Sequence, residues 1–231
     1  MENDTYPYVN LPLPYALNAL EPYIDTKTME IHYGRQLPAY INRLNAILKD
    51  FPELQSMTLE ELIVSSEDLY QNGLKVPVQN YAGGVYNHRF YFNGMAPPSN
   101  LSPRGILFEM IESQYGNYTS FKEVFKFEGM KVFGSGYAWL VYDDGVLRIV
   151  TTPNQNNPIA QGYCPILALD VWEHAYFLKH YNLRANYIED WFRVINWDEA
   201  TKNYLDCVNQ QKEKELQKRS KMKFSSNGLK R

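Results

Sequence analysis

An aspartate and a histidine lie four residues apart in the segment DVWEHAY, at residues 170–176. The run from Val171 to His180 predicts a helix, and residues four apart on a helix share one face. At that spacing the carboxylate of Asp170 and the imidazole of His174 can bind one metal ion. An isolated D-x-x-x-H pair is more often a helix-capping aspartate beside a partly buried histidine. A metal site therefore needs further ligands from elsewhere in the chain.

Histidine is scarce in this chain, which has four. His32 and His88 lie in two other predicted helices. His180 follows His174 by six residues, roughly 240° around a helix, and is expected at the surface. Three histidines and Asp170 would make a mononuclear site of nitrogen and oxygen ligands, which suits manganese or iron and leaves zinc possible. Spacing alone cannot bring the three segments together, because that requires a particular fold.

The first half of the chain predicts a helical layer. An arm with four prolines, residues 1–24, precedes three helices joined by short links. The helices are expected at about 25–49, 58–73 and 76–93. Pro38 should kink or bulge the first helix. The second opens with the capping box Thr58-x-x-Glu61 and closes at Asn72-Gly73. These features predict an antiparallel helical hairpin.

In the second half of the chain, the spacing of hydrophobic residues changes from helical to strand-like and then back to helical. The proline-rich segment 96–103 indicates a domain boundary. Two helices are expected after it, near 106–112 and from the capping box Ser120-x-x-Glu123. Three strands follow at 137–142, 146–151 and 165–169, and a long helix follows Asp198. We therefore predict an α+β fold whose mixed domain has a three-stranded antiparallel sheet with surrounding helices. The expected domains are 1–97, 98–211 and a basic tail, 212–231.

Composition narrows the class of protein. The chain has 231 residues, 45% of them hydrophobic, and no apolar run approaches the ~20 residues of a membrane helix. The N-terminus lacks the features of a signal peptide, so a cytoplasmic protein is expected. Residues 212–231 carry a net charge of +6, which leaves −9 for residues 1–211 and argues against nucleic acid as a partner. Cys164 and Cys207 lie in unrelated contexts and are expected to be reduced.

An ordered set of motifs makes the chain recognisable. It resembles the iron/manganese superoxide dismutase family, manganese type, over about residues 8–206. The matching segments are LPLPYALNALEPYI at 11–24, MEIHYGR at 29–35, AYINRLN at 39–45, YNH at 86–88, GSGYAWL at 134–140, NQ at 154–155, DVWEHAY at 170–176 and VINW at 194–197.

This resemblance implies a redox metal bound by His32, His88, Asp170 and His174. One manganese ion per subunit, or iron, would alternate between its +3 and +2 states while two superoxide anions become dioxygen and hydrogen peroxide. Glu173 would bridge to the partner's equivalent of His174. A homodimer is thus implied, and a tetramer is possible.

The resemblance also implies a set of residues around the metal. Tyr40 matches the family's gateway tyrosine, and Gln155 matches the glutamine of manganese-type members. Iron-type members usually carry a glutamine at the position of Gly84, so manganese is favoured. Trp172 is placed among the catalytic residues. The cationic positions of the substrate funnel correspond to Arg35 and Arg184.

Four positions depart from the family pattern: Gln36, Phe177, Phe92 and Tyr137. The first replaces a histidine and the second a tyrosine that would contact it across the dimer. The other two stand where tryptophan is common. Two alternatives stay open: a non-catalytic metal-binding structural protein that kept the fold, and a related metalloenzyme that handles peroxide or dioxygen.

Overall fold

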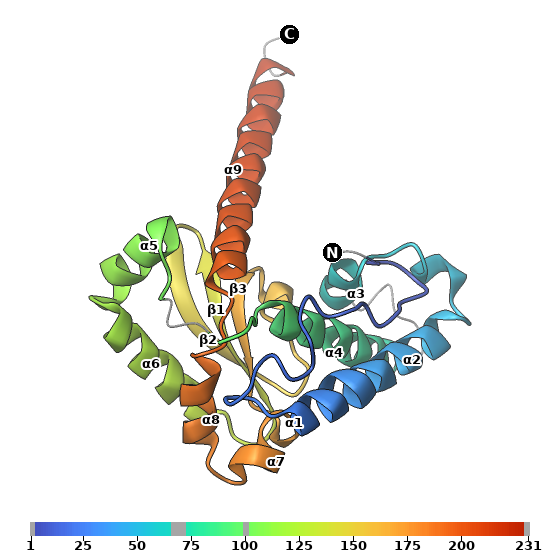
Figure 1. The fold of residues 1–231 in the computed structure, drawn as a ribbon. Helices are drawn as coiled ribbons and strands as arrows, with labels where there is room; N and C mark the ends of the chain where they lie inside the picture. Colours follow the sequence, from blue (N-terminus) through green and yellow to red (C-terminus); the bar gives the residue numbers. More distant parts are fainter. Residues whose placement is uncertain (1–2, 66–72, 99–101, 229–231) are drawn as a thin grey trace.

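The computed structural model describes residues 3–65, 73–98 and 102–228. Helical layers flank a three-stranded sheet, and the last helix projects from the body (Figure 1). The elements of the first half are α1 (Thr26–Ile31), η1 (His32–Gln36), α2 (Leu37–Leu48), η2 (Pro52–Leu54), α3 (Leu59–Val64) and α4 (Lys75–Asn93). Those of the second half are α5 (Gly105–Tyr115), α6 (Tyr118–Lys131), β1 (Gly136–Asp143), β2 (Val146–Pro153), η5 (Pro158–Gln161), β3 (Cys164–Asp170), η6 (Glu173–Ala175), α7 (Phe177–His180), α8 (Arg184–Trp191) and α9 (Trp197–Gly228). The α+β prediction is confirmed.

The first predicted helix is divided by one turn of π-helix. The side chain of Asp25 caps α1 by accepting a hydrogen bond from the Thr28 amide. At η1 the amide of Leu37 bonds to the carbonyl of His32, five residues back. Pro38 follows and has no amide hydrogen to donate, which confirms the predicted local bulge. The bulge sets the rotation of α2 relative to His32.

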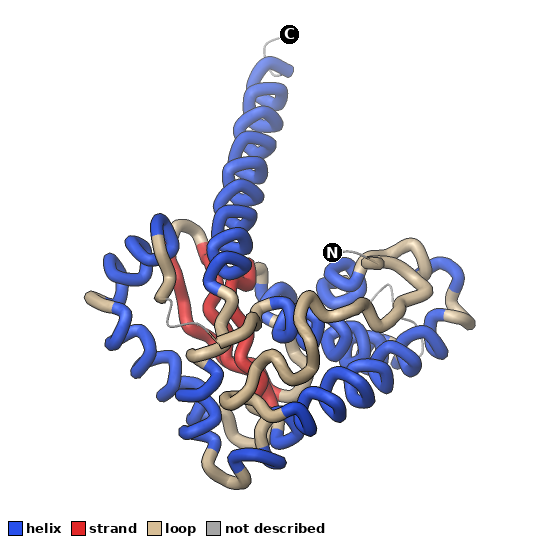
Figure 2. The backbone as a smooth tube through the Cα atoms, viewed as in Figure 1, coloured by secondary structure: helices blue, strands red, loops and turns tan. Residues whose placement is uncertain are grey.

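The remaining helices of the first half pack on one another. The reciprocal capping box of Thr58 and Glu61 opens α3, as expected. The helix ends at Val64, before the predicted stop at Asn72, which lies outside the described residues. α4 contacts α2, α3 and β3, and its second half, from Ala82 to Phe92, is buried. The ribbon and the tube show α2 and α4 side by side (Figures 1 and 2).

The sheet has the order β2-β1-β3, with both pairs antiparallel. Asp144 and Gly145 link β1 to β2, and both have positive φ, 47° and 88°. That combination matches the primed turns of two-residue hairpins, so the hairpin prediction is confirmed. The central strand β1 is buried along most of its length. α6 packs on β1 and β2, while α4 and α9 pack on β3.

Three local expectations are wrong. The run after Asp170 is no continuous helix: Asp170 ends β3, and His174 follows in the single 3₁₀ turn η6. His180 is buried, and its Nε2 lies 2.9 Å from Asp190 Oδ2, because α7 starts anew at Phe177 and turns inward. α6 begins earlier than expected, since the side chain of Asn117 caps it through the Ser120 amide.

The expectation of reduced cysteines is also wrong. Cys164 and Cys207 form a disulfide although they are 43 residues apart in sequence. Cys164 begins β3, and α9 packs along that strand with Cys207 on its inner face. Sequence context could not reveal this pairing, because it depends on how the last helix lies on the sheet. Within the described residues, no helix has both the length and the apolar character needed to span a bilayer.

Candidate metal centre

Four side chains from four elements converge between the two halves of the chain. His32 begins η1, His88 lies on α4, Asp170 ends β3 and His174 lies in η6. One possible ligand atom from each lies within 4.8 Å of every other. The structure thus brings together all four residues that the sequence singled out as ligands. His180, the fourth histidine, lies apart from them and pairs with Asp190.

The inward atoms of this cluster lack hydrogen-bond partners. In the described part of the chain none is found for Nε2 of His32, His88 or His174, or for Oδ2 of Asp170. Oδ2 of Asp170 lies 3.3 Å from His32 Nε2 and 3.5 Å from His174 Nε2. Leaving several buried polar atoms unpaired is costly unless something binds them. Three imidazole nitrogens and one carboxylate oxygen aimed at one point fit a transition-metal ion.

Burial sets the protonation of these groups. Burial, helped by the neighbouring His174, lowers the pKa of His32 to about 4. Burial and the nearby His32 lower the pKa of His88 to about 3. Burial alone would raise the pKa of Asp170, but the imidazoles of His174 and His32 outweigh it and hold that pKa well below its usual range. Near neutral pH, His32 and His88 therefore offer lone pairs and Asp170 a negative charge, as metal ligation requires.

Further contacts orient the ligands. His88 Nδ1 lies 2.7 Å from the carbonyl oxygen of Gly84, so it is the protonated nitrogen and leaves Nε2 free. Asp170 Oδ1 accepts a hydrogen bond of 2.8 Å from the Trp172 amide, which turns Oδ2 inward. The backbone carbonyl of Asp170 accepts from the Tyr187 hydroxyl at 2.8 Å. The last strand residue is therefore held through both its backbone and its side chain.

A chain of amide hydrogen bonds approaches the site from β2. Gln155 Nε2 donates to the Tyr40 hydroxyl at 2.9 Å, and the Tyr40 ring lies 5.0 Å from the His88 ring. Asn87 Nδ2 donates to Gln155 Oε1 at 3.2 Å, and Asn157 Nδ2 donates to Asn87 Oδ1 at 2.7 Å. Sequence reasoning missed Asn87 and Asn157. Asn87 belongs to the motif YNH, next to His88, but the residue type alone does not show which group an asparagine amide will bond to.

Two family models match the chain. The model of the iron/manganese superoxide dismutase α-hairpin domain matches residues 7–96, and that of the C-terminal domain of the same family matches residues 103–203. The chain belongs to the iron/manganese superoxide dismutase family. Together the matches include every element that supplies a residue to the metal centre.

Curated relatives of this superoxide dismutase family are similar over most of their length. A protein of Listeria monocytogenes named "Superoxide dismutase [Mn]" is 44% identical over 192 residues, which cover 83% of this chain and 95% of that protein. One of Bacillus anthracis, named "Superoxide dismutase [Mn] 2", is 38% identical over 200 residues, covering 87% and 96%. The similarity therefore extends across both halves of the superoxide dismutase fold.

The other residues that the family resemblance indicated lie at different depths. The ring of Trp172 stacks on that of His174 at 5.3 Å, and its indole nitrogen donates to the carbonyl of Asn154. Glu173 and Arg35 are exposed. The guanidinium of Arg184 binds backbone rather than the ligands: it donates to the carbonyls of Val132 and Gly134 at 2.6 and 2.8 Å and to the Tyr176 hydroxyl at 3.2 Å. Arg184 therefore stabilises the segment that precedes β1.

Three of the four positions that depart from the family pattern lie beside the ligands. Phe92 packs edge-on against His32 at 4.9 Å, and the ring of Tyr137 lies 6.4 Å from that of His88. The side-chain amide of Gln36 lies 3.4 Å from His174 Nδ1. Phe177 is exposed. Phe92, Tyr137 and Gln36 therefore change the lining of the site and leave its four possible ligands in place.

Proposed function

We propose that this protein is a manganese superoxide dismutase, which converts two superoxide anions into dioxygen and hydrogen peroxide. The observation that carries the proposal is the convergence of four unpaired ligand atoms, beside which Gln155 holds the Tyr40 hydroxyl. The names of the curated relatives support manganese. Bound manganese would supply the redox chemistry, accepting an electron from one superoxide and giving it to a second.

The ligands in this proposal are His32, His88, His174 and Asp170. Three of them, His32, His88 and Asp170, are buried, whereas His174 is partly exposed, and the single carboxylate lowers the charge of the site by one unit. Hydrogen bonds to ligands tune a metal's potential, so the bonds to His88 and Asp170 belong to the mechanism. Trp172, stacked on His174, would hold that imidazole in place and shield it.

Tyr40 is the proposed proton donor. Forming peroxide from superoxide consumes two protons, so a donor must stand beside the reacting oxygen. The Tyr40 oxygen accepts the Gln155 amide hydrogen, which leaves its own proton free to point elsewhere. Burial raises the pKa of Tyr40, and the phenol therefore stays protonated at neutral pH. Gln155 would position both this hydroxyl and solvent at the metal.

The space at residue 84 favours manganese over iron in this proposal. A Cβ added at Gly84 would run into the ring of Tyr40. A glutamine at that position, as in iron-type members, would therefore displace the tyrosine. Gln155 instead supplies its amide from the segment that follows β2.

We also propose a homodimer that forms around the exposed Glu173, with a tetramer as a possible further assembly. The apolar side chains of Phe177, Leu178 and Tyr181 are each about half exposed or more, at 48, 49 and 63%. Such a group beside an active site is typical of a contact surface. Arg35 would attract the superoxide anion from its exposed place in η1, and Arg184 would hold the segment before β1 against Tyr176.

Location and domain limits complete the proposal. We place the protein in the cytoplasm, with domains 1–97 and 98–211 and a basic tail, 212–231. Cell fractionation checks the location, and limited proteolysis near residues 98–102 and 211 checks the limits.

The deciding experiment is superoxide turnover by apo-protein reloaded separately with manganese and with iron, normalised to bound metal. We expect turnover with manganese. His174→Gln should lose stoichiometric manganese, whereas the matched control His180→Gln should retain it, because His180 pairs with Asp190 away from the cluster. Full occupancy without turnover would instead indicate a structural protein. Turnover of peroxide or dioxygen alone would indicate the related metalloenzyme.

A further inference from the structure

The disulfide lies where α9 leaves the body of the protein. Up to Cys207 the helix packs inward through buried side chains such as Ala200 and Tyr204. Beyond Val208, most described side chains as far as Lys218 are exposed. Figure 1 shows this part of α9 projecting from the sheet. Cys164–Cys207 is therefore the last covalent anchor before the helix enters solvent.

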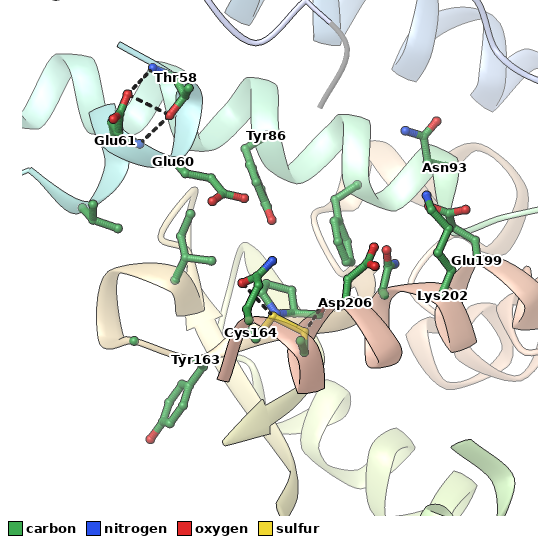
Figure 3. A pocket seen from close by; sticks show the side chains of 18 of the residues that line it. Thr58, Glu60, Glu61, Tyr86, Asn93, Tyr163, Cys164, Glu199, Lys202 and Asp206 are labelled. Atoms are coloured by element: carbon green, nitrogen blue, oxygen red, sulfur yellow. Dashed lines mark hydrogen bonds and ion pairs between the residues drawn. A yellow bond between two sulfur atoms is a disulfide. The ribbon is translucent and has the colours of Figure 1, made fainter. Parts of the chain in front are cut away.

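The two cysteines lie at the edge of a surface cavity. They line a cavity of about 630 Å³ between α3 and α4 on one side and β3 and α9 on the other (Figure 3). Lys202 and Lys214 lie on the wall of the same cavity. Cys164 is partly exposed, whereas Cys207 is 2% exposed. A small oxidant or reductant thus has a route to the sulfurs, and it meets Cys164 first.

We propose that Cys164 and Cys207 form a reversible redox site, closed by hydrogen peroxide, that fastens α9 to β3. The proposal rests on the proposed function, because superoxide dismutation would produce the peroxide in the same protein molecule. A disulfide in a reducing compartment is usually transient or redox-sensing. The proposed cytoplasmic location therefore favours a reversible bond over a permanent one.

The chemistry uses one peroxide for two thiols. The Cys164 thiolate attacks one peroxide oxygen, the O–O bond breaks, and the hydroxide that leaves takes up a proton to become water. The product is a sulfenic acid on Cys164. The Cys207 sulfur then attacks the Cys164 sulfur and displaces hydroxide, which becomes the second water with the remaining thiol proton. The two sulfurs lose two electrons in total, and peroxide gains both.

The environment assigns different roles to the two cysteines. Thiolates are favoured by nearby cations and by solvent access. Cys164 has the solvent access. The cavity that it shares with Lys202 and Lys214 also holds Glu60, Glu61, Glu199 and Asp206, so exposure rather than charge distinguishes the two sulfurs. Cys164 is therefore the attacking thiol. Buried Cys207 is the resolving thiol.

The redox site is separate from the metal centre. Cys164 is the first residue of β3 and Asp170 is the last, which places them about 20 Å apart at ~3.3 Å per residue. Opening the disulfide should therefore leave the metal ligands in place. Reduction of the disulfide should instead loosen α9, because only side-chain packing would then keep this helix against β3.

The test starts from manganese-loaded holoenzyme reduced with dithiothreitol and desalted without oxygen. One equivalent of hydrogen peroxide should remove both free thiols and link the peptides that contain Cys164 and Cys207. In Cys207→Ser, a sulfenic acid should be trapped on Cys164. In Cys164→Ser, which removes the accessible thiol, Cys207 should stay reduced under the same treatment. Thiols that survive a tenfold excess of peroxide would overturn the proposal.

Hydrogen exchange measures the consequence for α9. Amides of residues 200–211 should exchange faster in reduced wild-type protein than in oxidised protein, while those of β1 and β2 stay unchanged. The melting temperature should fall by about 5–10 °C, as expected when a loop of this length is no longer closed. Equal exchange in both states would overturn the fastening role.

Superoxide turnover of the same samples separates this proposal from the one on which it rests. Turnover per bound manganese should be equal in the oxidised and reduced forms. Superoxide supplied to reduced holoenzyme should close the disulfide, and catalase should prevent that closure. Closure by added peroxide in a sample without turnover would support the redox site while refuting the proposed function.

Discussion

Gln155 is fixed from two sides. Its amide nitrogen donates to Tyr40 at 2.9 Å, and its amide oxygen accepts from Asn87 at 3.2 Å. The orientation of a glutamine amide is assigned from its hydrogen-bond partners. The Asn87 oxygen already accepts a hydrogen bond from Asn157, so Asn87 must donate through its Nδ2 to Gln155 Oε1. The donor end of Gln155 therefore faces Tyr40. This pairing ties the second half of the chain to the first at the active site.

Replacing this donor tests the proposed role of Gln155. Gln155→Glu keeps the size of the side chain but changes its donor end into an acceptor, which would draw the Tyr40 proton toward itself. We expect turnover per bound manganese to fall by about 10–100-fold, the usual effect of changing a residue that supports a metal site. Manganese content should stay close to that of wild type.

The matched control for this change is Gln217→Glu on the exposed part of α9, which should behave as wild type. Unchanged turnover in Gln155→Glu would contradict the positioning role. A loss of metal equal to the loss of turnover would assign Gln155 to metal retention instead.

At the scale of residues, the sequence indicated which side chains form the site better than it indicated their local structure and partners. The D-x-x-x-H spacing pointed to Asp170 and His174, which do meet, but through a strand end and a 3₁₀ turn rather than a helix face. His180 has the same side chain as the candidate ligands, and only the break before Phe177 turns it toward Asp190. Such outcomes depend on backbone turns that short-range periodicity does not encode.

On the scale of elements, two glycines allow α4 to approach its neighbours. A Cβ at Gly84 would meet the ring of Tyr40 on α2, and a Cβ at Gly83 would meet the backbone carbonyl of Gln155. A side-chain atom can move aside, whereas the carbonyl belongs to the backbone of Gln155, whose side-chain amide bonds to Tyr40. Gly83 is thus the position where helix packing and site geometry are most tightly coupled.

Gly83→Ala should separate these two effects of glycine. Alanine in a helix interior normally adds about 1 kcal/mol of stability over glycine. Here the added methyl should push α4 from the segment after β2 and lower the free energy of unfolding by about 1–3 kcal/mol. Turnover should fall as well, because Gln155 moves. Denaturant unfolding of the apo-protein and turnover of the holoenzyme measure the two results.

Gly34→Ala is the control for this substitution, since a Cβ there meets nothing within 4 Å. Gly34 lies in η1, within a continuous helical run, so this change should raise the free energy of unfolding by up to about 1 kcal/mol, the ordinary gain of alanine over glycine. If Gly83→Ala stabilised the protein, α4 would have room that the structure does not show.

The elements themselves were largely predictable from sequence. The capping box of Thr58, the Asp144-Gly145 turn and the bulge before Pro38 each follow from local chemistry, and the structure has all three. The start of α6 at Asn117 was missed because Ser120 offered a competing cap three residues later. The disulfide was missed for a different reason: β3 and α9 become neighbours only in the finished fold.

On the scale of the whole molecule, exposed apolar side chains gather at the corner formed by α7, as they also do along α6. Phe177, Leu178 and Tyr181 are exposed on and after α7, next to Glu173. α7 contacts α1 and α8 at this corner (Figure 1). The family resemblance implies that Phe177 and Gln36 replace a tyrosine and a histidine that many manganese-type members pair across a dimer. The proposed dimer of this chain should therefore depend on apolar packing at this point.

A charged substitution at Phe177 tests the dimer as a property of the molecule. The molar mass of the wild-type holoenzyme from sedimentation should be twice the chain mass of 27.0 kDa. Phe177→Asp would bury an unpaired carboxylate in the interface, which is costly, so the dimer dissociation constant should rise at least tenfold. Phe127→Asp is the matched control, because Phe127 is also exposed, at 62%, but lies on α6. Sedimentation velocity over a concentration series measures both variants. A dimer broken by Phe127→Asp and kept by Phe177→Asp would move the interface to α6, and the bridging role of Glu173 would be lost with it.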